Sequence, residues 1–532
     1  MLTAIAYTEH LPLRLMIMPN LFELNYTQHF QKLPSELYTP TNPQGISNPK
    51  LVVSSDSAAL LIGVDADSLN SADALKLISG QGILSSWKPV AMKYTGHQFG
   101  QYNPELGDGR GILLAQVKTD NGTLLDLHLK GAGLTPYSRQ GDGRAVLRSS
   151  IREFLCSEAL FALKIPTTRA LCVIDSDTPV FRETTETAAM IVRVSESHIR
   201  FGHFEYCSFT EQHDLLKTLC DYVIAQHYPH LTDKNTSDQN STEGKYAEFY
   251  RYTLQKTAKL MAQWQSIGFN HGVMNTDNMS IIGDTFDFGP FAFLDDYDPG
   301  FTCNHSDNQG RYAFNQQPNV ANWNLAILAQ ALLPLVNKDL LTERLDSYSD
   351  LFSHYFLEIM REKLGLSPSE STLQNNAQKD SRIRPDVNTL LHKDIVDETL
   401  AMMAQCRLDF TFFFRQLSQI GKPEIKKTIR DMALNVSIFD DWFENYYAVL
   451  LADKQDIHSS KRSTKMNRVN PKYILRNYLA QNAIEAAQSG DYSIVENLHE
   501  VLKKPFDEQP DFDYLSALPP DWGKILEISC SS

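Results

Sequence analysis

The chain has 532 residues, of which 49 are Lys or Arg and 64 are Asp or Glu, so its formal net charge is −15 at pH 7. This acidity excludes a general electrostatic attraction to nucleic acid. The sequence also lacks the run of about 18 apolar residues that a membrane-spanning helix requires. A hydrophobic fraction of 42% is ordinary for a folded protein and excludes disorder throughout.

The distribution of glycines and of periodic segments predicts an α+β fold with two lobes. Glycines and strand signals concentrate in residues 81–205, and helical periodicity dominates residues 206–450. A small α/β lobe followed by a large, mainly helical lobe is also the outline of a protein kinase. We expect residues 1–80 to form an extension that packs on this core, and residues 451–532 to form a helical extension that ends in a tail.

The first 18 residues are mildly apolar but lack the basic segment that begins a signal peptide. We interpret them as a native leader segment of a cytoplasmic protein.

Several elements of the small lobe are predicted from local patterns, in chain order. Residues 125–130 alternate apolar and polar side chains, as a half-buried strand does. Residues 145–164 have helical periodicity, and Pro166 ends that helix. Two further strands are predicted at 171–174 and 189–194.

The large lobe is predicted to be almost entirely helical. Two polar segments, 232–245 and 367–388, interrupt the pattern and are interpreted as surface loops. The expected helices lie at 211–228, 246–268, 323–337, 340–364, 393–419, 438–452 and 472–488.

Two glycine-rich segments are candidates for binding phosphate. In the first, Gly107 to Gly111, closely spaced glycines would let backbone N–H groups approach a phosphate, and Arg110 could add a charge-assisted contact. A tight hairpin explains the same glycines equally well. The second, Gly141-Asp142-Gly143-Arg144, directly precedes the predicted helix, whose N-terminus would favour anions.

Two further pairs of charged residues fit phosphate binding. Protein kinases hold phosphates with a strand lysine that is oriented by a helix glutamate, and Lys130 and Glu153 have these positions. Arg193 and Arg200 follow in the next predicted strand region and could grip phosphates as well. The alternatives are an exposed lysine with an unrelated glutamate, and two surface salt bridges.

The segment from His271 to Asn278, followed by Asp287-Phe288-Gly289, resembles the catalytic motifs of kinases. On that template Asn278 and Asp287 would bind a metal ion. The position of the catalytic Asp is occupied by Val273, which cannot accept a proton. Asp277 is the nearby carboxylate that could replace it. The alternative is a turn rich in Asn and Asp between a helix and a hairpin.

Several longer stretches together closely resemble the selenoprotein O family over most of the chain. They are GHQFG (96–100), LGDGRGILL (106–114), HLKGAGLTPYSRQGDGRAVLRSSIREF (128–154), RFGHFE (200–205), HGVMNTDNMS (271–280), FLDDYDPGF (293–301), QPNVANWNL (317–325) and the terminal CSS. The resemblance implies a protein-kinase-like fold and protein adenylylation, in which AMP from ATP is attached to Ser, Thr or Tyr hydroxyls of target proteins. It also implies a nucleotide that is inverted relative to a kinase, and it leaves room for UTP as donor.

The resemblance assigns roles to individual residues. Asp277 would be the proton acceptor, Asn278 and Asp287 would hold Mg²⁺ or Mn²⁺, and Glu153 would pair with Lys130. The residues expected to contact ATP are Gly107, Gly109, Arg110, Lys130, Asp142, Gly143, Arg193, Arg200 and Asp287.

Cys530 occupies the antepenultimate position, where many members of that family carry selenocysteine. Selenium-dependent chemistry is therefore not expected here. The resemblance implies a redox-sensitive disulfide between Cys303 and Cys530, whereas two separate reduced thiols are the ordinary state in a cytosol.

Two other functions remain open from the residues alone. The kinase-like motif order also fits an ATP-dependent phosphotransferase. The valine at position 273 also fits a noncatalytic nucleotide-binding pseudokinase.

Overall fold

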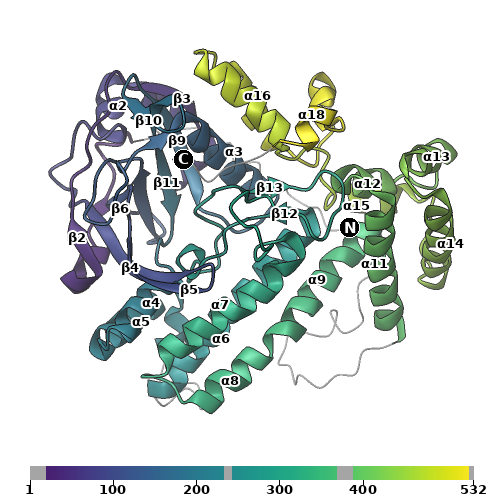
Figure 1. Ribbon diagram of the computed structural model, residues 1–532, viewed down its shortest axis with the longest axis horizontal. Helices are drawn as coiled ribbons and strands as arrows, with labels where there is room; N and C mark the ends of the chain where they lie inside the picture. Colours follow the sequence, from purple (N-terminus) through teal and green to yellow (C-terminus); the bar gives the residue numbers. More distant parts are fainter. Residues whose placement is uncertain (1–18, 233–241, 368–386, 527–532) are drawn as a thin grey trace, which may run out of the picture.

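The computed structural model describes residues 19–232, 242–367 and 387–526. The segment 1–18 and Cys530 lie outside the described residues, as does most of each polar segment. The predicted α+β class is confirmed, because a sheet forms the N-terminal part and helices form most of the remainder (Figure 1). Within the described residues, no helix combines the length and apolar composition that crossing a bilayer requires.

The small lobe is built on an antiparallel sheet. Seven strands of the described chain follow one another across it, in the order β2 (Tyr38–Pro40), β4 (Val90–Gln98), β6 (Gly111–Lys118), β7 (Leu124–Lys130), β11 (Thr185–Ser195), β9 (Arg169–Asp175) and β3 (Lys50–Ser54). Four further strands pair with interior strands of this order: β1 (Tyr26–Thr27) with β6, β5 (Gln101–Gly107) with β4, and both β8 (Ala145–Val146) and β10 (Pro179–Phe181) with β11.

The strand β7 differs from its prediction, because both of its faces are buried. Leu125, Leu127 and Leu129 lie in a core formed with the short helices α1 (Asp56–Ile62) and α2 (Ala72–Ile78). The polar side chains on the opposite face are buried as well, because they pair with other buried polar groups. The alternation predicted the strand correctly, but it could not show that an ion network covers the polar face.

The helical part includes the long helix α6 and continues to the end of the described residues. Its helices are α4 (Phe201–Phe209), α5 (His213–His227), α6 (Thr242–Ile267), α7 (Gln317–Leu332), α8 (Lys338–Asp346), α9 (Tyr348–Leu364), α11 (Val387–Cys406), α12 (Phe410–Leu417), α13 (Pro423–Met432), α14 (Val436–Ala452), α15 (Ser460–Asn467), α16 (Asn477–Gln488), α17 (Ser493–Leu502) and α18 (Asp521–Lys524).

Two of the predicted long helices are each divided in the structure. The predicted helix 340–364 is broken at Ser347, between α8 and α9. The predicted helix 393–419 is broken before α12, where the Asp409 side chain accepts a hydrogen bond of 2.8 Å from the Phe412 N–H and so caps a new helix. Apolar periodicity continues through both breaks, so it did not reveal them.

The helix α3 (Leu147–Ala162) joins the two lobes and the C-terminal extension. It packs against β9 and β11 on one side and against α16 and α17 on the other (Figure 1). The predicted helix began at residue 145, but Ala145 and Val146 instead pair with Ala189 and Ala188 of β11. These two residues therefore form a strand of the sheet, and the helix begins at Leu147.

A buried ion cluster ties the C-terminal helices to the large lobe. Arg476, which precedes α16, donates hydrogen bonds of 2.8 and 3.0 Å to both carboxylate oxygens of Asp409. The same guanidinium contacts Asp295, which follows the two-residue strand β13 (Ala292–Phe293). One arginine thus connects three segments that are far apart in the sequence.

We expect Arg476→Met to lower the apparent stability by about 3–5 kcal/mol, because it leaves two carboxylates without their buried partner. Urea denaturation followed by tryptophan fluorescence measures this loss. The control is Arg430→Met, which removes an equally bidentate pair with Asp440 at the surface and should leave the urea midpoint nearly unchanged. Equal effects of the two substitutions would contradict the importance assigned to the buried cluster.

Candidate active site

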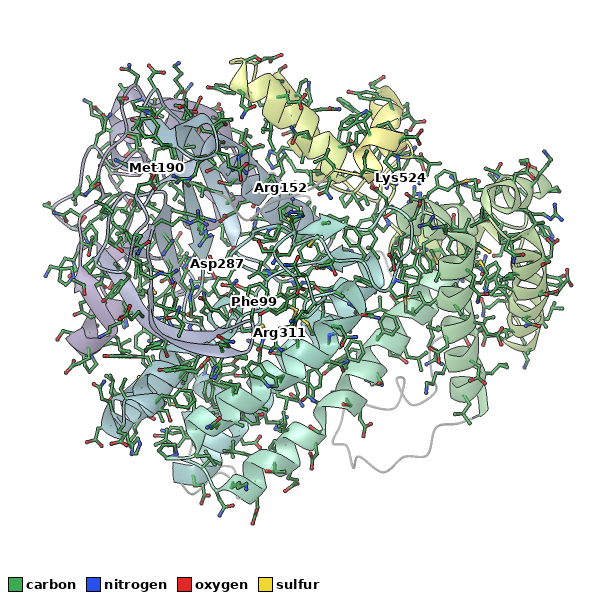
Figure 2. The ribbon with its side chains drawn as sticks, viewed as in Figure 1. Phe99, Arg152, Met190, Asp287, Arg311 and Lys524 are labelled. Carbon is green, nitrogen blue, oxygen red and sulfur yellow. The ribbon has the colours of Figure 1, made fainter. Side chains whose placement is uncertain are left out.

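A cavity of about 1010 Å³ lies between the sheet and the segment that contains Asp287, which Figure 2 labels near the centre of the molecule. It is lined by most of the residues that the sequence singled out. They are Gly107, Gly109, Arg110, Lys130, Asp142, Gly143, Arg193, Arg200, Asp277, Asn278 and Asp287. Residues separated by up to 180 positions in the chain therefore meet at one site.

The remaining candidates have other positions. Glu153 lies behind the cavity wall and contacts Lys130. Cys303 is buried against Gly272, near the start of the segment 271–278, since a Cβ added to Gly272 would lie 2.5 Å from the Cys303 Sγ. Cys530 lies outside the described residues, so the disulfide stays a prediction.

The first glycine-rich segment connects β5 to β6, but these strands do not form a hairpin with each other. Both pair instead with β4. Asp108 fixes the connection, because its carboxylate accepts from the Met92 N–H at 3.1 Å and contacts His128 Nε2 at 3.1 Å. A Cβ on Gly109 would lie 2.9 Å from the Tyr137 carbonyl oxygen, so glycine is needed for this close approach.

The second glycine-rich segment enters the cavity as a loop. Gly143 has φ +70°, and a Cβ there would lie 2.0 Å from the Gly133 carbonyl oxygen, so no other residue fits. The expectation that this segment directly precedes a helix is wrong, because β8 intervenes. Asp142 accepts hydrogen bonds of 2.8 and 3.0 Å from the guanidinium of Arg182, which the sequence did not indicate.

A chain of ion pairs crosses the back of the cavity and joins the two lobes. Lys130 Nζ on β7 contacts Glu153 Oε2 on α3 at 2.5 Å, and Arg193 Nε on β11 donates to Glu153 Oε1. Arg193 Nη1 then donates to Asp287 Oδ1 at 2.8 Å, and Arg200 Nη1 donates to Asp287 Oδ2. Lys130 and Glu153 are only 6% and 2% exposed, which excludes the surface alternatives.

Burial and pairing shift the pKa of each of these groups. Burial lowers the pKa of Lys130 to about 8, although Glu153 opposes this shift. Burial alone would raise the pKa of Glu153, but Arg193 and Lys130 outweigh it and lower that pKa to about 2. Burial is likewise outweighed at Asp287, where Arg200 and Arg193 hold the pKa well below its usual range. Both carboxylates are therefore ionised at neutral pH.

The cations of this network exceed its two carboxylates. Arg110, whose pKa is lowered by burial, lies close enough to interact electrostatically with Glu153 and Arg193. Arg193 Nη2 and Arg200 Nε are buried donors without a hydrogen-bond partner among the described residues. Buried donors of this kind are normally satisfied, so they indicate that an anion belongs here.

The segment 271–278 is shaped by contacts of its side chains with backbone carbonyl groups. His271 Nε2 lies 2.9 Å from the Phe286 carbonyl oxygen, and its ring stacks on Trp264, so it links this segment to the one before Asp287. Val273 lines the cavity at the position where a kinase has a carboxylate. Asn278 Nδ2 donates to the Val273 carbonyl oxygen at 3.0 Å, which turns its Oδ1 away from that contact.

Asp277 is 7% exposed and lies at the junction of the lobes. Its backbone carbonyl accepts a hydrogen bond of 2.7 Å from Arg200 Nη1. Burial and the charge of Asp287 outweigh Arg200 and raise the pKa of Asp277 to about 7. Its Oδ1 is buried without a hydrogen-bond partner among the described residues, whereas Oδ2 lies 3.4 Å from Gln98 Nε2. The carboxylate can therefore accept a proton near neutral pH.

The oxygen donors of Asn278 and Asp287 fit a hard divalent cation. Among the described residues, no group of three or more His, Cys, Asp or Glu has the geometry of a metal site. A site with few protein ligands fits Mg²⁺, which keeps waters and takes further oxygens from substrate phosphates. To bind the ion, the Asp287 carboxylate would have to give up its ion pair with Arg193, with Arg200 or with both.

Other site residues escaped the sequence reasoning because they are recognisable only by contact. Gln98, Asp108, His128 and Arg182 belong to no motif with a stated chemical role. The stretches of family resemblance contain Gln98, Asp108 and His128, and this was the only signal that could have found them.

Comparisons with known proteins give one consistent result. A family model described as protein adenylyltransferase SelO matches residues 20–503. A protein nucleotidyltransferase YdiU of Pseudomonas putida (strain GB-1) is 47% identical over 515 residues, which cover 97% of this chain and 100% of that protein. The protein of the same name from Vibrio parahaemolyticus is 48% identical over 513 residues, which cover 96% and 99%.

We expect Glu153→Gln to destabilise the protein by about 3–5 kcal/mol at pH 7, because it leaves Lys130 and Arg193 without their buried anion. The folded-state pKa of Glu153 is about 2, below its ordinary value of 4.5. Its stabilising effect is therefore complete above about pH 4.5 and is lost as the pH falls towards 2.

Urea midpoints of wild type and Glu153→Gln, measured from pH 7 to pH 3.5, test this expectation. The difference between them should be largest at neutral pH and should shrink on acidification. Glu105→Gln, at an exposed site, should stay within about 0.5 kcal/mol of wild type. A difference that is constant with pH would show that the ionised form of Glu153 contributes nothing.

Proposed function

The chain belongs to the SelO family of protein adenylyltransferases and is a nucleotidyltransferase, and we propose that it transfers AMP from ATP to Ser, Thr or Tyr hydroxyls of target proteins, with Asp277 as proton acceptor. The observation that carries this proposal is the charge distribution of the cavity. Basic side chains gather at its back, and the carboxylate of Asp277 lies beside them at the junction of the lobes.

The same charge distribution supports an inverted nucleotide. A triphosphate tail is drawn to Lys130, Arg110, Arg193 and Arg200, which border the sheet. A carboxylate would repel that tail, so Asp142 with its partner Arg182 is better suited to the ribose or the base. The β- and γ-phosphates would then lie towards the small lobe, and the α-phosphate would face the large lobe.

This orientation assigns the transfer step to residues of the large lobe. The acceptor hydroxyl oxygen attacks the α-phosphorus, the bond to the β-phosphate oxygen breaks, and pyrophosphate leaves. The hydroxyl proton passes to the carboxylate of Asp277. Lys130, Arg110, Arg193 and the remaining donor of Arg200 hold the charge of the leaving pyrophosphate.

Asn278 and Asp287 are the proposed metal ligands, and Mg²⁺, when bound there, would neutralise phosphate charge. Mn²⁺ has the same preference for oxygen donors and stays an alternative. UTP as a second donor, the cytoplasmic location and the disulfide between Cys303 and Cys530 also stay predictions.

Incubation with ATP that is radiolabelled at either the α- or the γ-phosphate tests the proposed activity. Casein and the chain itself serve as acceptor proteins. We expect label in protein from the α-position alone. Label from the γ-position would instead indicate a phosphotransferase, and nucleotide binding without any transfer would indicate a pseudokinase. Asp277→Asn should lower transfer by at least about 10²-fold with an unchanged thermal midpoint; full activity of this variant would remove Asp277 from the proposed role.

The open end of the cavity offers a surface for the base. Phe181 at the end of β10 lines the cavity and is 76% exposed. Stacking of a base on an aromatic ring contributes about 1–3 kcal/mol. We expect Phe181→Ala to raise KM for ATP on the order of tenfold while kcat changes less, in steady-state transfer assays. Tyr514→Ala, an exposed aromatic on the C-terminal extension, is the control. A KM within twofold of wild type would place the base elsewhere.

A further inference from the structure

A hairpin of the small lobe lies directly on the proposed catalytic segment of the large lobe. It consists of β4, the turn residues Phe99 and Gly100, and β5. Both turn residues have positive φ, at 49° and 81°, as a two-residue hairpin turn requires. Figure 2 labels Phe99 near the centre of the view. The turn lies against Arg311, because a Cβ on Gly100 would lie 3.3 Å from the Arg311 guanidinium carbon.

Backbone groups of the hairpin bind the residues that precede Asp277. The His97 N–H donates to Thr276 Oγ1 at 2.7 Å, and the Phe99 N–H donates to Asn275 Oδ1 at 3.2 Å. A Cβ on Gly96 would lie 3.1 Å from Asp277 Cβ, tighter than an ordinary contact. The hairpin therefore packs against residues 275–277 at several points. The small lobe thus contacts the segment that carries the Asp277 carboxylate.

Gln98 makes the side-chain contact within this interface. Its Nε2 lies 3.4 Å from Asp277 Oδ2, and its Oε1 accepts a hydrogen bond of 3.2 Å from Asn103 Nδ2 on β5. A primary amide has donors on one end and acceptors on the other. Because Asn103 occupies the acceptor end, the donor end of Gln98 must face Asp277.

The two carboxylate oxygens of Asp277 consequently differ. Oδ2 faces the amide of Gln98, whereas Oδ1 is buried without a hydrogen-bond partner among the described residues. Gln98 also lines the cavity, so its contact with Asp277 lies at the substrate side rather than behind it. A donor at Oδ2 restricts rotation of the carboxylate, so this contact fixes how the carboxylate of Asp277 faces the cavity.

We infer that Gln98, oriented by Asn103, is a positioning residue for the transfer reaction. It holds the carboxylate of Asp277 in one orientation at the cavity wall. This inference rests on the proposed function, because it requires Asp277 to accept the proton. Gln98 belongs to the small lobe and Asp277 to the large one. The Asp277 carboxylate is therefore aligned only when the hairpin packs against the large lobe.

Transfer from α-labelled ATP to casein, with Mg²⁺ present, tests the role of Gln98. We expect Gln98→Ala to lower kcat by about 10²-fold, since a misplaced reacting group costs that order of rate. KM for ATP and the Kd for ATP from calorimetry should stay within twofold of wild type. The thermal midpoint should stay within a few degrees of wild type. Gln98→Glu, which keeps the size but places a negative charge against Asp277, should lower kcat at least as much.

Two further variants separate positioning from packing. Asn103→Ala should lower kcat by about tenfold, because Gln98 remains but its amide is free to turn. Gln101→Ala is the matched control, since Gln101 pairs with Gln98 across the hairpin but is exposed, and it should keep full activity.

Several outcomes would overturn the inference. It is wrong if kcat of Gln98→Ala lies within twofold of wild type, or if Gln101→Ala loses as much activity as Gln98→Ala. It is also wrong if the affinity for ATP falls as far as kcat, because the hairpin would then only hold the lobes together. Failure of the wild type to transfer the α-label overturns the proposed function and this inference with it, whereas normal wild-type transfer with a fully active Gln98→Ala overturns this inference alone.

Discussion

The contact on which the site depends is the ion chain from Lys130 through Glu153 and Arg193 to Asp287. It joins two strands, the helix α3 and the segment that contains Asp287. Lys130, Glu153 and Arg193 are buried, and Asp287 is partly buried. Breaking a buried pair leaves an uncompensated charge, whereas the intact chain fixes the lobes in register. The glycine segments, the helical lobe and the C-terminal extension are arranged around this constraint.

The same network explains how a strongly acidic chain can bind a triphosphate. The overall charge is −15, whereas the cavity gathers Arg110, Lys130, Arg193 and Arg200 at its back. Without a nucleotide the arginines are held by Glu153 and Asp287. Binding of a nucleotide with its metal ion would replace some of these ion pairs by contacts with phosphate. The carboxylates thus hold the arginines in place and balance their charge while no nucleotide is bound.

Much of the site could be predicted from the sequence, because its residues lie in short motifs with fixed chemistry. Residue type and spacing made candidates of the glycines at 107, 109 and 143 and of the carboxylates at 277 and 287. The pairing of Lys130 with Glu153 was expected from the family resemblance, since residue type alone left both of them as surface residues. The positions at which helices begin and end were less predictable. Pairing of Ala145 and Val146 with β11, and the cap formed by Asp409, depend on groups that periodicity does not detect.

The sequence by itself determined the fold class, the family and the types of groups in the cavity, since these depend on local pattern and composition. Only the tertiary structure decided which groups touch. Gln98 meets Asp277 across 179 positions, and Arg182 meets Asp142 across 40. Contacts at such separation arise from the packing of whole lobes, and no local periodicity encodes them. The burial that raises the pKa of Asp277, and lowers that of Lys130, comes from the same packing.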